Sequence, residues 1–546
     1  MNGAHIIVEF FRREGISLVF SYPGATLMPL SLALLDSGIR VVQPRHEQGA
    51  AFAAEGYARA TGKAGVCIAT SGPGATNLVT GIADAYMDSI PLVAITAQVH
   101  NRFIGKNAFQ ETDIIGLTRP VVKHSFLVLN IEELPEILKD AFTLAETGRP
   151  GPVLIDVPCN FLHEEQRDPL FPEQANLRAL PDLPDLDGML VRRVRKLLRE
   201  SRKPCIYAGG GIVSANAEAE LLRFAEENGL PVTTSLMGIG AFPDGHPLSL
   251  RWLGMHGMAY ANRAVAECDL LLTLGARFSD RVTGPVEGFA PNATVVHVDA
   301  DASELNKNKQ VDIPILADVK QFLRAMNRRR TTCADEHAQW LAALADWKRT
   351  MRKPLPEKGK LRGARVLQML NGFLTDEMTL VTGVGQHQMW TAQYCTFDRP
   401  RRFLTSGGLG AMGFGLPAAI GAQLARPEET VILVDGDGSF QMNIQELATV
   451  FAEKLPLKMI LMNNQRLGMV AQWEERLYGK RARDTNLALP GRHAPYPDFC
   501  AIAAAYGIPA LEIRDERQFA AALRKTLADR KPHLLNLLIQ PDDEVT

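Results

Sequence analysis

The stretch VILVDGDGSFQMNIQELATVFAEKLPLKMILMNNQRLGMVAQ, from Val431 to Gln472, decides the fold of the carboxy-terminal part of the chain. It opens with the apolar run Val431 to Val434, whose length and β-branched residues are typical of a buried parallel strand. A helical spacing of apolar residues follows, and a second apolar run, Leu457 to Met462, ends in Asn463 and Asn464. A right-handed crossover between parallel strands brings both strand ends to one edge of the sheet. The pattern therefore predicts a strand, a helix and a second strand.

Polar side chains at the ends of these two strands predict a site for a metal ion and a phosphate. Asp437, in the segment DGDGS, supplies a carboxylate, and Asn464 supplies an amide oxygen. Both are hard ligands of the kind that Mg²⁺ prefers. The amides of Gly438 and Ser439, and the helix start beside them, suit phosphate oxygens. The alternative for this segment alone is an ordinary turn, because Asp-Gly pairs are common in turns.

The GDG segment followed by the Asn pair resembles the thiamine diphosphate signature, in which these two elements frame a Mg²⁺-diphosphate group. The resemblance implies three metal ligands, which are the side chains of Asp437 and Asn464 and the main-chain oxygen of Arg466. With the Asn pair in place, the ordinary turn becomes the weaker interpretation.

Length and composition bound the class of protein. The 546 residues are enough for about three domains of ordinary size. The 59 basic and 61 acidic residues nearly balance, which argues against nucleic acid or an anionic membrane as a partner. No apolar run approaches the length of a membrane-spanning helix, and the first residues indicate an amphipathic helix instead of a signal peptide. Seven scattered cysteines without a CxxC motif fit a reduced, cytoplasmic chain.

Strands alternate with helices in three parts of the chain, a pattern that predicts three α/β domains with doubly wound parallel sheets. The segments between them are rich in Pro and Asp, or in Arg and Lys, and are interpreted as linkers. The expected organisation is a first domain at 1–165, a linker at 166–190, a central domain at 191–325, a connector at 326–362 and a third domain at 363–546.

A family resemblance extends over nearly the whole chain. The chain resembles acetohydroxyacid synthase (acetolactate synthase), and most closely its bacterial catalytic large subunit, through the segments RHEQGAA, ATSGPGATN, NAFQETD, GMHG, GARFSDRVTG, VGQHQMW, GLGAMGFGLPAA and NNQRLGMVAQW. Members of this family decarboxylate pyruvate on thiamine diphosphate. They transfer the two-carbon unit to pyruvate or 2-ketobutyrate, in the first common step of branched-chain amino acid biosynthesis.

The resemblance also implies cofactors and partners. Thiamine diphosphate is expected between a pyrimidine-binding first domain and a diphosphate- and Mg²⁺-binding third domain, and FAD is expected in the central domain. Because the first domain faces the third domain of another subunit in the family, we expect a homodimer or a dimer of dimers. A small regulatory subunit is compatible with this organisation.

Glu47 is the main catalytic candidate. It begins an alanine-rich helix after an apolar strand, a position where a glutamate usually just compensates the helix dipole. Thiamine chemistry, however, needs a carboxylic acid beside N1′ of the aminopyrimidine ring, and RHEQGAA resembles the family segment that supplies it. The resemblance further implies that Arg277 binds the acceptor carboxylate and that Trp473 shapes the 2-ketobutyrate pocket. Phe109 and Gln110 are expected to line the donor side, although Phe109 could be a core residue and Arg277 a surface charge.

Other residues are expected to bind thiamine diphosphate. The segment 406–417 is too rich in glycine for a plain helix, and its alternative role is a glycine-lined contact between helix and sheet. The resemblance assigns the 4′-amino group to the carbonyl of Gly410 and the bend of the cofactor to Met412. Gln386 and His387 follow a strand and are expected to bind the diphosphate. The full predicted set is Gly24, Gln386, His387, Gly410, Met412, Gly438, Ser439 and Met469.

The central part has no GxGxxG fingerprint, so spacing alone gives weak support to a dinucleotide site. Its segments nevertheless resemble the FAD-binding stretches of the family. The flavin is expected to be structural, because the overall reaction is not a redox reaction. The residues implied are Gly209, Gly210, Gly211, Leu253, Gly254, Met255, His256, Gly275, Ala276, Arg277, Arg281, Val282, Asp299 and Asp318.

The chain departs from the family pattern at four places. Ala25 stands where the family has the second glycine of YPGG, and Cys159 stands where it has the lysine of a PKD segment. Ser279 replaces an acid in ARFDDR, and the loop after Trp473 is longer than in close relatives. These changes bear on substrate access and on FAD affinity more than on thiamine chemistry.

Two other functions are compatible with the same pattern. One is another branch of the thiamine diphosphate family, a decarboxylase, a glyoxylate carboligase-like enzyme or a pyruvate oxidase. Glu47 argues against the carboligase, and Arg277 and Trp473 argue against a simple decarboxylase. The other is a non-catalytic regulatory paralogue, against which the intact Glu47, Asp437 and Asn464 argue.

Overall fold

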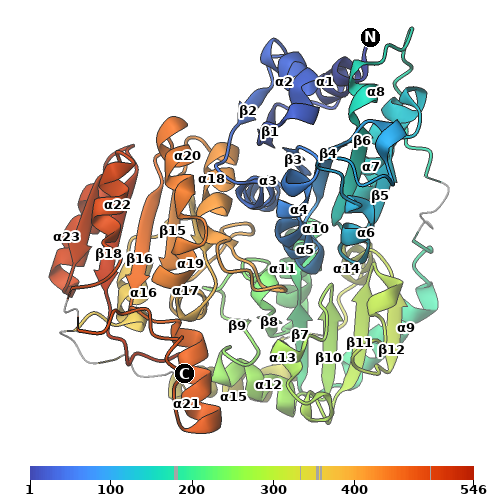
Figure 1. Cartoon of the computed structure of the whole chain (residues 1–546). Helices are drawn as coiled ribbons and strands as arrows, with labels where there is room; N and C mark the ends of the chain where they lie inside the picture. The colour runs from blue at the N-terminus through green and yellow to red at the C-terminus, as the bar shows by residue number, and fades with distance from the viewer. Residues whose placement is uncertain (178–182, 333, 352–355, 357–359, 492–493, 546) are drawn as a thin grey trace. The chain divides into compact units, whose positions relative to one another are not determined.

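Three parallel six-stranded sheets with helices packed on them organise the computed structural model (Figure 1). The structure describes all residues except 178–182, 333, 352–355, 357–359, 492–493 and 546. The predicted α/β fold with three parallel sheets is confirmed. Parts of the predicted linker (178–182) and of the predicted connector (333, 352–355 and 357–359) lie outside the described residues, and the domain boundaries stay predictions.

The first sheet has the strand order β2-β1-β3-β4-β6-β5, with parallel pairing throughout. The order reverses direction between β1 and β3, which makes that point the expected place for a ligand. Its strands are β1 Leu18–Ser21, β2 Arg40–Val42, β3 Gly65–Ala69, β4 Leu92–Gln98, β5 His124–Leu127 and β6 Pro152–Pro158. Its longer helices are α1 Gly3–Arg13, α2 Met28–Leu35, α3 Glu47–Thr61, α5 Val79–Asp88 and α7 Leu134–Glu146.

The second sheet has the order β12-β11-β10-β7-β8-β9. Counted from β7, this is the 3-2-1-4-5-6 order of dinucleotide-binding folds, with its reversal between β7 and β10. The strands are β7 Pro204–Ala208, β8 Val232–Thr234, β9 Ser249–Trp252, β10 Leu270–Leu274, β11 Thr294–Asp299 and β12 Ile313–Leu316. The longer helices are α9 Gly188–Glu200, α11 Glu218–Asn228, α12 Ala259–Glu267, α14 Val319–Asn327 and α15 Ala338–Thr350.

The third sheet, β14-β13-β15-β16-β18-β17, repeats the order of the first. The crossover predicted from Val431 onward is confirmed, because β15 and β16 pair in parallel with α20 between them in the chain. The strands are β13 Met378–Thr382, β14 Phe403–Leu404, β15 Thr430–Gly436, β16 Lys458–Asn463, β17 Ala510–Ile513 and β18 His533–Leu538. The helices are α16 Gly363–Asn371, α17 Gln386–Tyr394, α18 Gly415–Ala425, α19 Asp437–Gln441, α20 Leu447–Ala452, α21 Gly468–Tyr478, α22 Phe499–Ala505 and α23 Glu516–Leu527.

The chain forms two compact units. One unit comprises Met1–Leu180, Glu377–Gln388 and Leu404–Asp543 and contains the first sheet and most of the third. The other comprises Pro181–Asp376, Met389–Phe403 and Glu544–Thr546 and contains the second sheet. Residues that end the strands of the first and third sheets therefore belong to a single unit.

Direct packing of α3 on α18 joins the first and third sheets into one hydrophobic core. Both helices are rich in small residues, and their backbones approach closely. A Cβ atom on Gly56 would lie 2.1 Å from the carbonyl oxygen of Ala418, and one on Gly421 would lie 1.8 Å from that of Ala53. Only glycine fits at these two positions without moving a helix.

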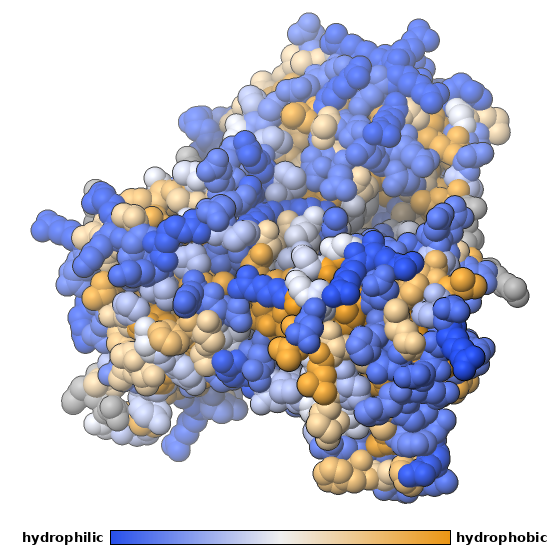
Figure 2. All heavy atoms as spheres, turned by 90° about the horizontal axis from the view of Figure 1, so that it is seen from above, coloured by the Kyte–Doolittle hydropathy of each residue, from blue (hydrophilic) through white to orange (hydrophobic). Residues whose placement is uncertain are grey.

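The face of the chain drawn in Figure 2 is mostly hydrophilic, with hydrophobic residues in separate patches. Large apolar side chains that are exposed include Leu35, at 76%, and Phe109, at 89%. Among the residues that the structure describes, no helix combines the length and the apolar character needed to span a membrane.

We predict that Gly421→Ala destabilises the chain by about 1–3 kcal/mol, because the added methyl group overpacks the α3–α18 contact. The measurement is urea unfolding of the full chain, monitored by circular dichroism. The matched control is Gly188→Ala at the start of α9, where the nearest atom to a new Cβ is the flexible end of Arg192 at 3.6 Å. Equal stability of the two variants would contradict close helix packing.

Candidate functional site

Two predicted metal ligands lie at the carboxyl ends of neighbouring strands. Asp437 follows β15 and Asn464 follows β16, and these strands pair in parallel up to Gly436 and Met462. Gln386 and His387 begin α17 shortly after β13. Strand β13 pairs with β15 on the side opposite to β16. The site thus lies where the strand order of the third sheet reverses, between β13 and β15.

A buried chain of amide side chains holds Asn464 in place. Asn464 Nδ2 donates to Gln386 Oε1 at 3.2 Å. Gln386 Nε2 donates in turn to Gln472 Oε1 at 3.0 Å and to the carbonyl oxygen of Asp543 at 2.9 Å. A Cβ on Gly468 would lie 2.0 Å from Gln386 Oε1, so that glycine makes room for the amide. Sequence reasoning did not identify Gln472 or Asp543.

The backbone of Arg466 is oriented toward the same place as Asn464. Arg466 pairs with Asn486 in an antiparallel bridge whose hydrogen bonds are made by the flanking residues, Leu467 to Thr485 and Leu487 to Gln465. The N–H and C=O groups of Arg466 are therefore not used by the pairing. Its N–H donates to Asn464 Oδ1 at 3.0 Å, and the amide oxygen keeps a second lone pair for a cation.

Asp437 has the character of a cation ligand. It is 1% exposed, and among the described residues its Oδ2 atom has no hydrogen-bond partner. Burial raises the pKa of this carboxyl to about 7. A buried carboxylate without a partner is costly unless a cation or a proton neutralises it. The donor set of one carboxylate, one amide oxygen and one peptide oxygen therefore fits Mg²⁺.

The glycines of the GDG segment have neighbours within the chain. A Cβ on Gly436 would lie 2.9 Å from Nδ1 of His387, whose Nε2 is 3.3 Å from Asp435 Oδ1. A Cβ on Gly438 would lie 2.6 Å from a methyl carbon of Leu467. The glycines thus leave room for the side chains of His387 and Leu467. Helix α19 has only five residues, so local amides and not a long helix would bind a phosphate.

The glycine-rich segment before α18 is non-helical, as predicted, and the helix starts only at Gly415. Gly410 and Gly413 have φ angles of +71° and +89°, which side-chain-bearing residues rarely adopt. The amide of Gly413 donates to Ser439 Oγ at 3.2 Å. The segment that carries Gly410 and Met412 is therefore attached to the residues that follow β15.

Glu47 is the first residue of α3 and is 7% exposed. Its Oε2 atom accepts a hydrogen bond of 2.9 Å from Asn77, a residue of the quoted ATSGPGATN segment that was given no role. Burial argues against simple compensation of the helix dipole, which an exposed carboxylate achieves. No hydrogen bond or ion pair of Glu47 within the described residues reaches Gly410, Met412 or Asp437.

The donor-side candidates lie beyond the carboxyl end of β4, at the same edge as Glu47. Gly72, which follows β3, would place a Cβ 2.8 Å from the carbonyl oxygen of Gln110. Gln110 has a φ angle of +62°, and Phe109 beside it is 89% exposed, which makes the core alternative for Phe109 wrong. Gly24, after β1, packs against Thr70.

The predicted flavin residues gather at the reversal point of the second sheet. Gly209–Gly211 follow β7, and Gly275 follows β10. The amide of Gly211 donates to the carbonyl oxygen of Gly275 at 2.9 Å, and a Cβ on Gly209 would lie 2.1 Å from that oxygen. These glycines let two strand ends meet, where dinucleotides bind in sheets of this order.

A cavity of about 310 Å³ is lined by other predicted flavin residues of the same unit. Its lining includes Leu253, Gly254 and Met255 from one predicted segment and Asp280 and Val282 from another. The amide of Met255 donates to the carbonyl oxygen of Arg281 at 2.8 Å, which ties the two segments together. Segments that are distant in the sequence therefore form one pocket.

Other predicted flavin residues have local contacts. Asp299 Oδ2 is 3.7 Å from Nε2 of His297, and Asp318 caps α14 through the amide of Gln321. The carbonyl oxygen of His256 accepts from Gln393 at 2.8 Å. Arg277 is partly buried and its carbonyl oxygen accepts from Tyr207. Ala276 is buried beside them.

Trp473 and Met469 lie on α21 in the first compact unit, whereas Arg277 lies in the second. The prediction that a loop begins directly after Trp473 is wrong for the first residues, because α21 continues to Tyr478. The apolar positions of the helix extend its pattern beyond the tryptophan. Residues 492–493 of this loop lie outside the described residues.

Comparison with known families gives one match in each of the three sheet-forming parts of the chain. The thiamine pyrophosphate enzyme N-terminal TPP binding domain matches residues 1–117, the central domain matches 191–326 and the C-terminal TPP binding domain matches 383–537. The fold and the carboxyl-edge site thus define a thiamine pyrophosphate enzyme.

Full-length relatives narrow the class. The chain is 47% identical to acetolactate synthase 1, chloroplastic, of Nicotiana tabacum over 100% of its own length and 82% of the relative. It is 48% identical to acetolactate synthase 1, chloroplastic, of Oryza sativa subsp. japonica and 47% identical to the Arabidopsis thaliana enzyme, with 100% of the chain and 85% and 82% of those relatives covered. The chain belongs to the acetolactate synthase family. Its closeness to the bacterial form stays a prediction.

We predict that Asp437→Asn abolishes Mg²⁺-dependent retention of thiamine diphosphate yet stabilises the cofactor-free chain at pH 8. The folded-state pKa of about 7 exceeds the unfolded value of about 4. The folded chain therefore holds an extra proton between these values, and its free energy of unfolding falls as pH rises toward 7. Asparagine does not titrate, so Asp437→Asn should not show this fall in the free energy of unfolding.

The measurements are equilibrium dialysis of thiamine diphosphate with and without Mg²⁺, and thermal unfolding of the cofactor-free chain. The matched control is Asp156→Asn, because Asp156 is equally buried but its oxygens accept from Thr96 and Gln98. Its Mg²⁺ dependence should be unchanged. Retention of cofactor by Asp437→Asn at low Mg²⁺ would contradict the ligand role.

Proposed function

We propose that this chain, as an acetolactate synthase, decarboxylates pyruvate and joins the two-carbon unit to a second 2-ketoacid, at the entry to branched-chain amino acid biosynthesis. The observation that carries the proposal is the buried carboxylate of Asp437, whose Oδ2 atom has no hydrogen-bond partner among the described residues, at the end of the strand next to that of Asn464. Its donors suit a Mg²⁺ ion that neutralises a diphosphate. Thiamine diphosphate, when bound, would supply a nucleophilic carbon that adds to the ketone group and a cationic ring that accepts the electrons released by decarboxylation.

The residues around this point would hold the cofactor. Asp437, Asn464 and the carbonyl of Arg466 would bind Mg²⁺, and Gln386, His387 and the amides of Gly438 and Ser439 would bind the diphosphate. Gly410 and Met412 would receive the aminopyrimidine, for which their non-helical segment leaves backbone groups accessible. Met469, on the first turn of α21, would lie beside them.

Glu47 would supply the carboxyl group that exchanges a proton with N1′ of the aminopyrimidine. Support comes from its burial and from Asn77, which holds one oxygen and leaves the other available. A buried carboxyl group with a fixed orientation is suited to acid–base work.

Two residues have proposed roles toward the acceptor ketoacid. Arg277 would bind the carboxylate of the acceptor, since a guanidinium presents paired donors to a carboxylate. Trp473 would favour 2-ketobutyrate over pyruvate by filling space beside the extra methylene. Both are proposals from family resemblance, as are the donor-side roles of Phe109 and Gln110.

FAD would occupy the second sheet in a structural role. The 3-2-1-4-5-6 strand order and the cavity of about 310 Å³ at the predicted segments support it. Because decarboxylation and carbon–carbon bond formation require no net electron transfer, the flavin would stabilise this unit and not react.

The active form would be a homodimer or a dimer of dimers. Support comes from Phe109, an exposed aromatic at the edge that carries Glu47, and from the absence of a described contact between Glu47 and the metal ligands. A small regulatory subunit remains compatible with this assembly. Six described cysteines are free thiols, which supports a reducing compartment such as the cytoplasm.

The test of the function is product analysis of the purified chain with pyruvate, thiamine diphosphate and Mg²⁺. Acetolactate as the main product supports the proposal. Acetaldehyde alone would indicate a decarboxylase, hydrogen peroxide would indicate a pyruvate oxidase, and cofactor binding without turnover would indicate a regulatory paralogue.

We predict that Glu47→Gln keeps the affinity for thiamine diphosphate within about twofold but lowers turnover by roughly 10²–10⁴-fold, the usual contribution of a positioned acid–base group. Glutamine can still accept the hydrogen bond from Asn77, so the fold is retained. Dialysis of the cofactor and steady-state acetolactate formation measure the two effects. Near wild-type turnover would contradict the role of Glu47.

We predict that Trp473→Leu removes most of the preference between 2-ketobutyrate and pyruvate while acetolactate is still formed. One methylene in a shaped pocket contributes about 1–3 kcal/mol, which corresponds to a tens-fold preference. Competition between the two acceptors gives the product ratio. The matched control is Tyr478→Leu on the same helix, where the side chain is 73% exposed. An unchanged ratio in Trp473→Leu would place selectivity elsewhere.

A further inference from the structure

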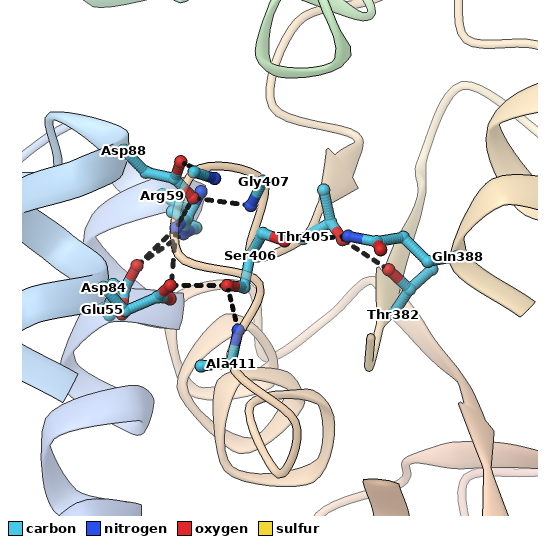
Figure 3. Close-up of polar contacts among 11 residues, drawn as sticks. Glu55, Arg59, Asp84, Asp88, Thr382, Gln388, Thr405, Ser406, Gly407 and Ala411 are labelled. Carbon is cyan, nitrogen blue, oxygen red and sulfur yellow. Dashed lines mark hydrogen bonds and ion pairs between the residues drawn. The ribbon is translucent and has the colours of Figure 1, made fainter. Parts of the chain in front are cut away.

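A buried group of three carboxylates and one arginine lies outside the predicted cofactor residues. Glu55 and Arg59 belong to α3, and Asp84 and Asp88 belong to α5. All four residues are at most 8% exposed, and one oxygen of each carboxylate lies within 4.8 Å of the others. Figure 3 shows these side chains gathered beside the segment that contains Ser406 and Gly407. We call the four residues the acid cluster.

Arg59 and Asp88 form an ion pair within the acid cluster. Arg59 donates to Glu55 Oε1 and, at 2.6 Å, to Asp88 Oδ2. Asp88 also accepts from the amides of Gly407 at 2.9 Å and Gly408 at 2.6 Å. The carboxylate of Asp88 therefore connects the arginine to the backbone of the glycine-rich segment.

Asp84 holds the same segment through Ser406. The hydroxyl of Ser406 donates to Asp84 Oδ1 and accepts from the amide of Ala411 at 2.8 Å (Figure 3). On the other side, Gln388 Nε2 donates to the carbonyl oxygen of Ser406 at 2.8 Å and to Thr405 Oγ1 at 2.7 Å. The segment is thus held from both sides.

The charges of the acid cluster do not balance when every group is ionised. Three carboxylates face one guanidinium, and the Oε2 atom of Glu55 and the Oδ2 atom of Asp84 are buried without a hydrogen-bond partner in the described part of the chain. Two buried carboxylates with oxygens within 4.8 Å of each other cannot both keep full charge. One proton between them would satisfy both atoms.

The segment that the acid cluster holds adds no charge beside this pair. The residues from Leu404 to Ala425, which include the loop and α18, contain no charged side chain. They present Ser406 and Phe414, whose ring centroid is 5.1 Å from the guanidinium carbon of Arg59. Arg59 and Asp88 are therefore the charged neighbours of Glu55 and Asp84.

We propose that Glu55 and Asp84 share one proton, and that this pair, with Arg59 and Asp88, positions the segment 406–411 for the aminopyrimidine ring of thiamine diphosphate. The positioning role rests on the proposed function, because Gly410 lies in this segment. The proton forms a hydrogen bond between one carboxyl group and the other carboxylate, and no covalent bond changes. The four are positioning residues.

The proposal has a consequence for pH dependence. Burial raises the pKa of both carboxyls, and that of Asp84 to about 7. The folded chain therefore binds a proton that the unfolded chain has released above about pH 4, so its stability falls as pH rises toward 7 and stays lower above it. Loss of the proton leaves two repelling carboxylates behind Ser406 and loosens the segment.

Asp84→Asn tests the shared proton. The amide oxygen can accept from Ser406 while the amide nitrogen donates to Glu55, so the variant imitates the protonated pair. We expect the cofactor-free variant to melt at a higher temperature than the wild type at pH 8.5, and at a similar temperature at pH 5.5. In the wild type, loss of this proton should weaken the affinity for thiamine diphosphate between pH 6 and 9, by up to about tenfold per pH unit. This contribution should be absent in Asp84→Asn.

Asp88→Asn is the matched control on the same helix. Asp88 needs its full charge, because it accepts from Arg59 and from two amides, and an amide nitrogen would face those donors. This variant should melt at a lower temperature and bind the cofactor more weakly at every pH. Glu55→Gln is the second variant for the pair, and it should reproduce Asp84→Asn.

The outcomes separate the two proposals. If Asp84→Asn and Glu55→Gln are destabilised as much as Asp88→Asn at pH 8.5, or if the melting temperature depends on pH as steeply in both variants as in the wild type, the shared proton is wrong. If the melting profiles behave as expected but cofactor affinity keeps its pH dependence, the positioning role is wrong. If wild-type protein binds no thiamine diphosphate, the proposed function fails, and the melting profiles still decide the shared proton.

Discussion

The contact between α3 and α18 fixes the geometry on which the rest of the first compact unit depends. Gly56 and Gly421 let the two backbones approach closely, so the first and third sheets share a single core. Helix α3 begins with Glu47, and α18 follows the segment of Gly410. The start of α3 is fixed further by Glu446, which accepts from the amide of Arg45 at 2.9 Å. Any shift between these helices would therefore move a catalytic candidate relative to a cofactor-binding segment.

Some buried carboxylates of the first compact unit have an oxygen without a hydrogen-bond partner among the described residues. Asp156 is buried too, but its two oxygens are satisfied by Thr96 and Gln98, as expected for a structural group. Asp437 keeps an oxygen without a partner among the described residues, and so do Glu55 and Asp84. At Asp437 the neighbouring oxygen ligands suit a metal ion, and between Glu55 and Asp84 the two carboxyl groups suit a shared proton. The same electrostatic cost thus leads to two different roles.

The sequence predicted those parts of the fold and site that depend on long apolar runs and on strand-end motifs. The crossover from β15 to β16, with Asp437 and Asn464 at the ends of these neighbouring strands, follows from apolar runs that are buried on both faces. The strands β5, β9, β14 and β17 were not identified, and each lies at the edge of a sheet. These strands have only two to four residues, too few for a clear apolar pattern, and β17 also exposes Leu511 and Glu512.

Contacts made by tertiary packing could not be read from the sequence. Asn77 with Glu47, and Gln472 with Gln386, are brought together from segments far apart in the chain. The dinucleotide-type strand order of the second sheet also had no local signal, because no GxGxxG fingerprint accompanies it.

The central claim is that the third sheet holds Mg²⁺ at its reversal point. Anomalous scattering from a crystal grown with Mn²⁺ and thiamine diphosphate tests it most directly. The account predicts a single strong peak about 2.0–2.3 Å from oxygens of Asp437, Asn464 and Arg466, and a peak away from these three oxygens would contradict it.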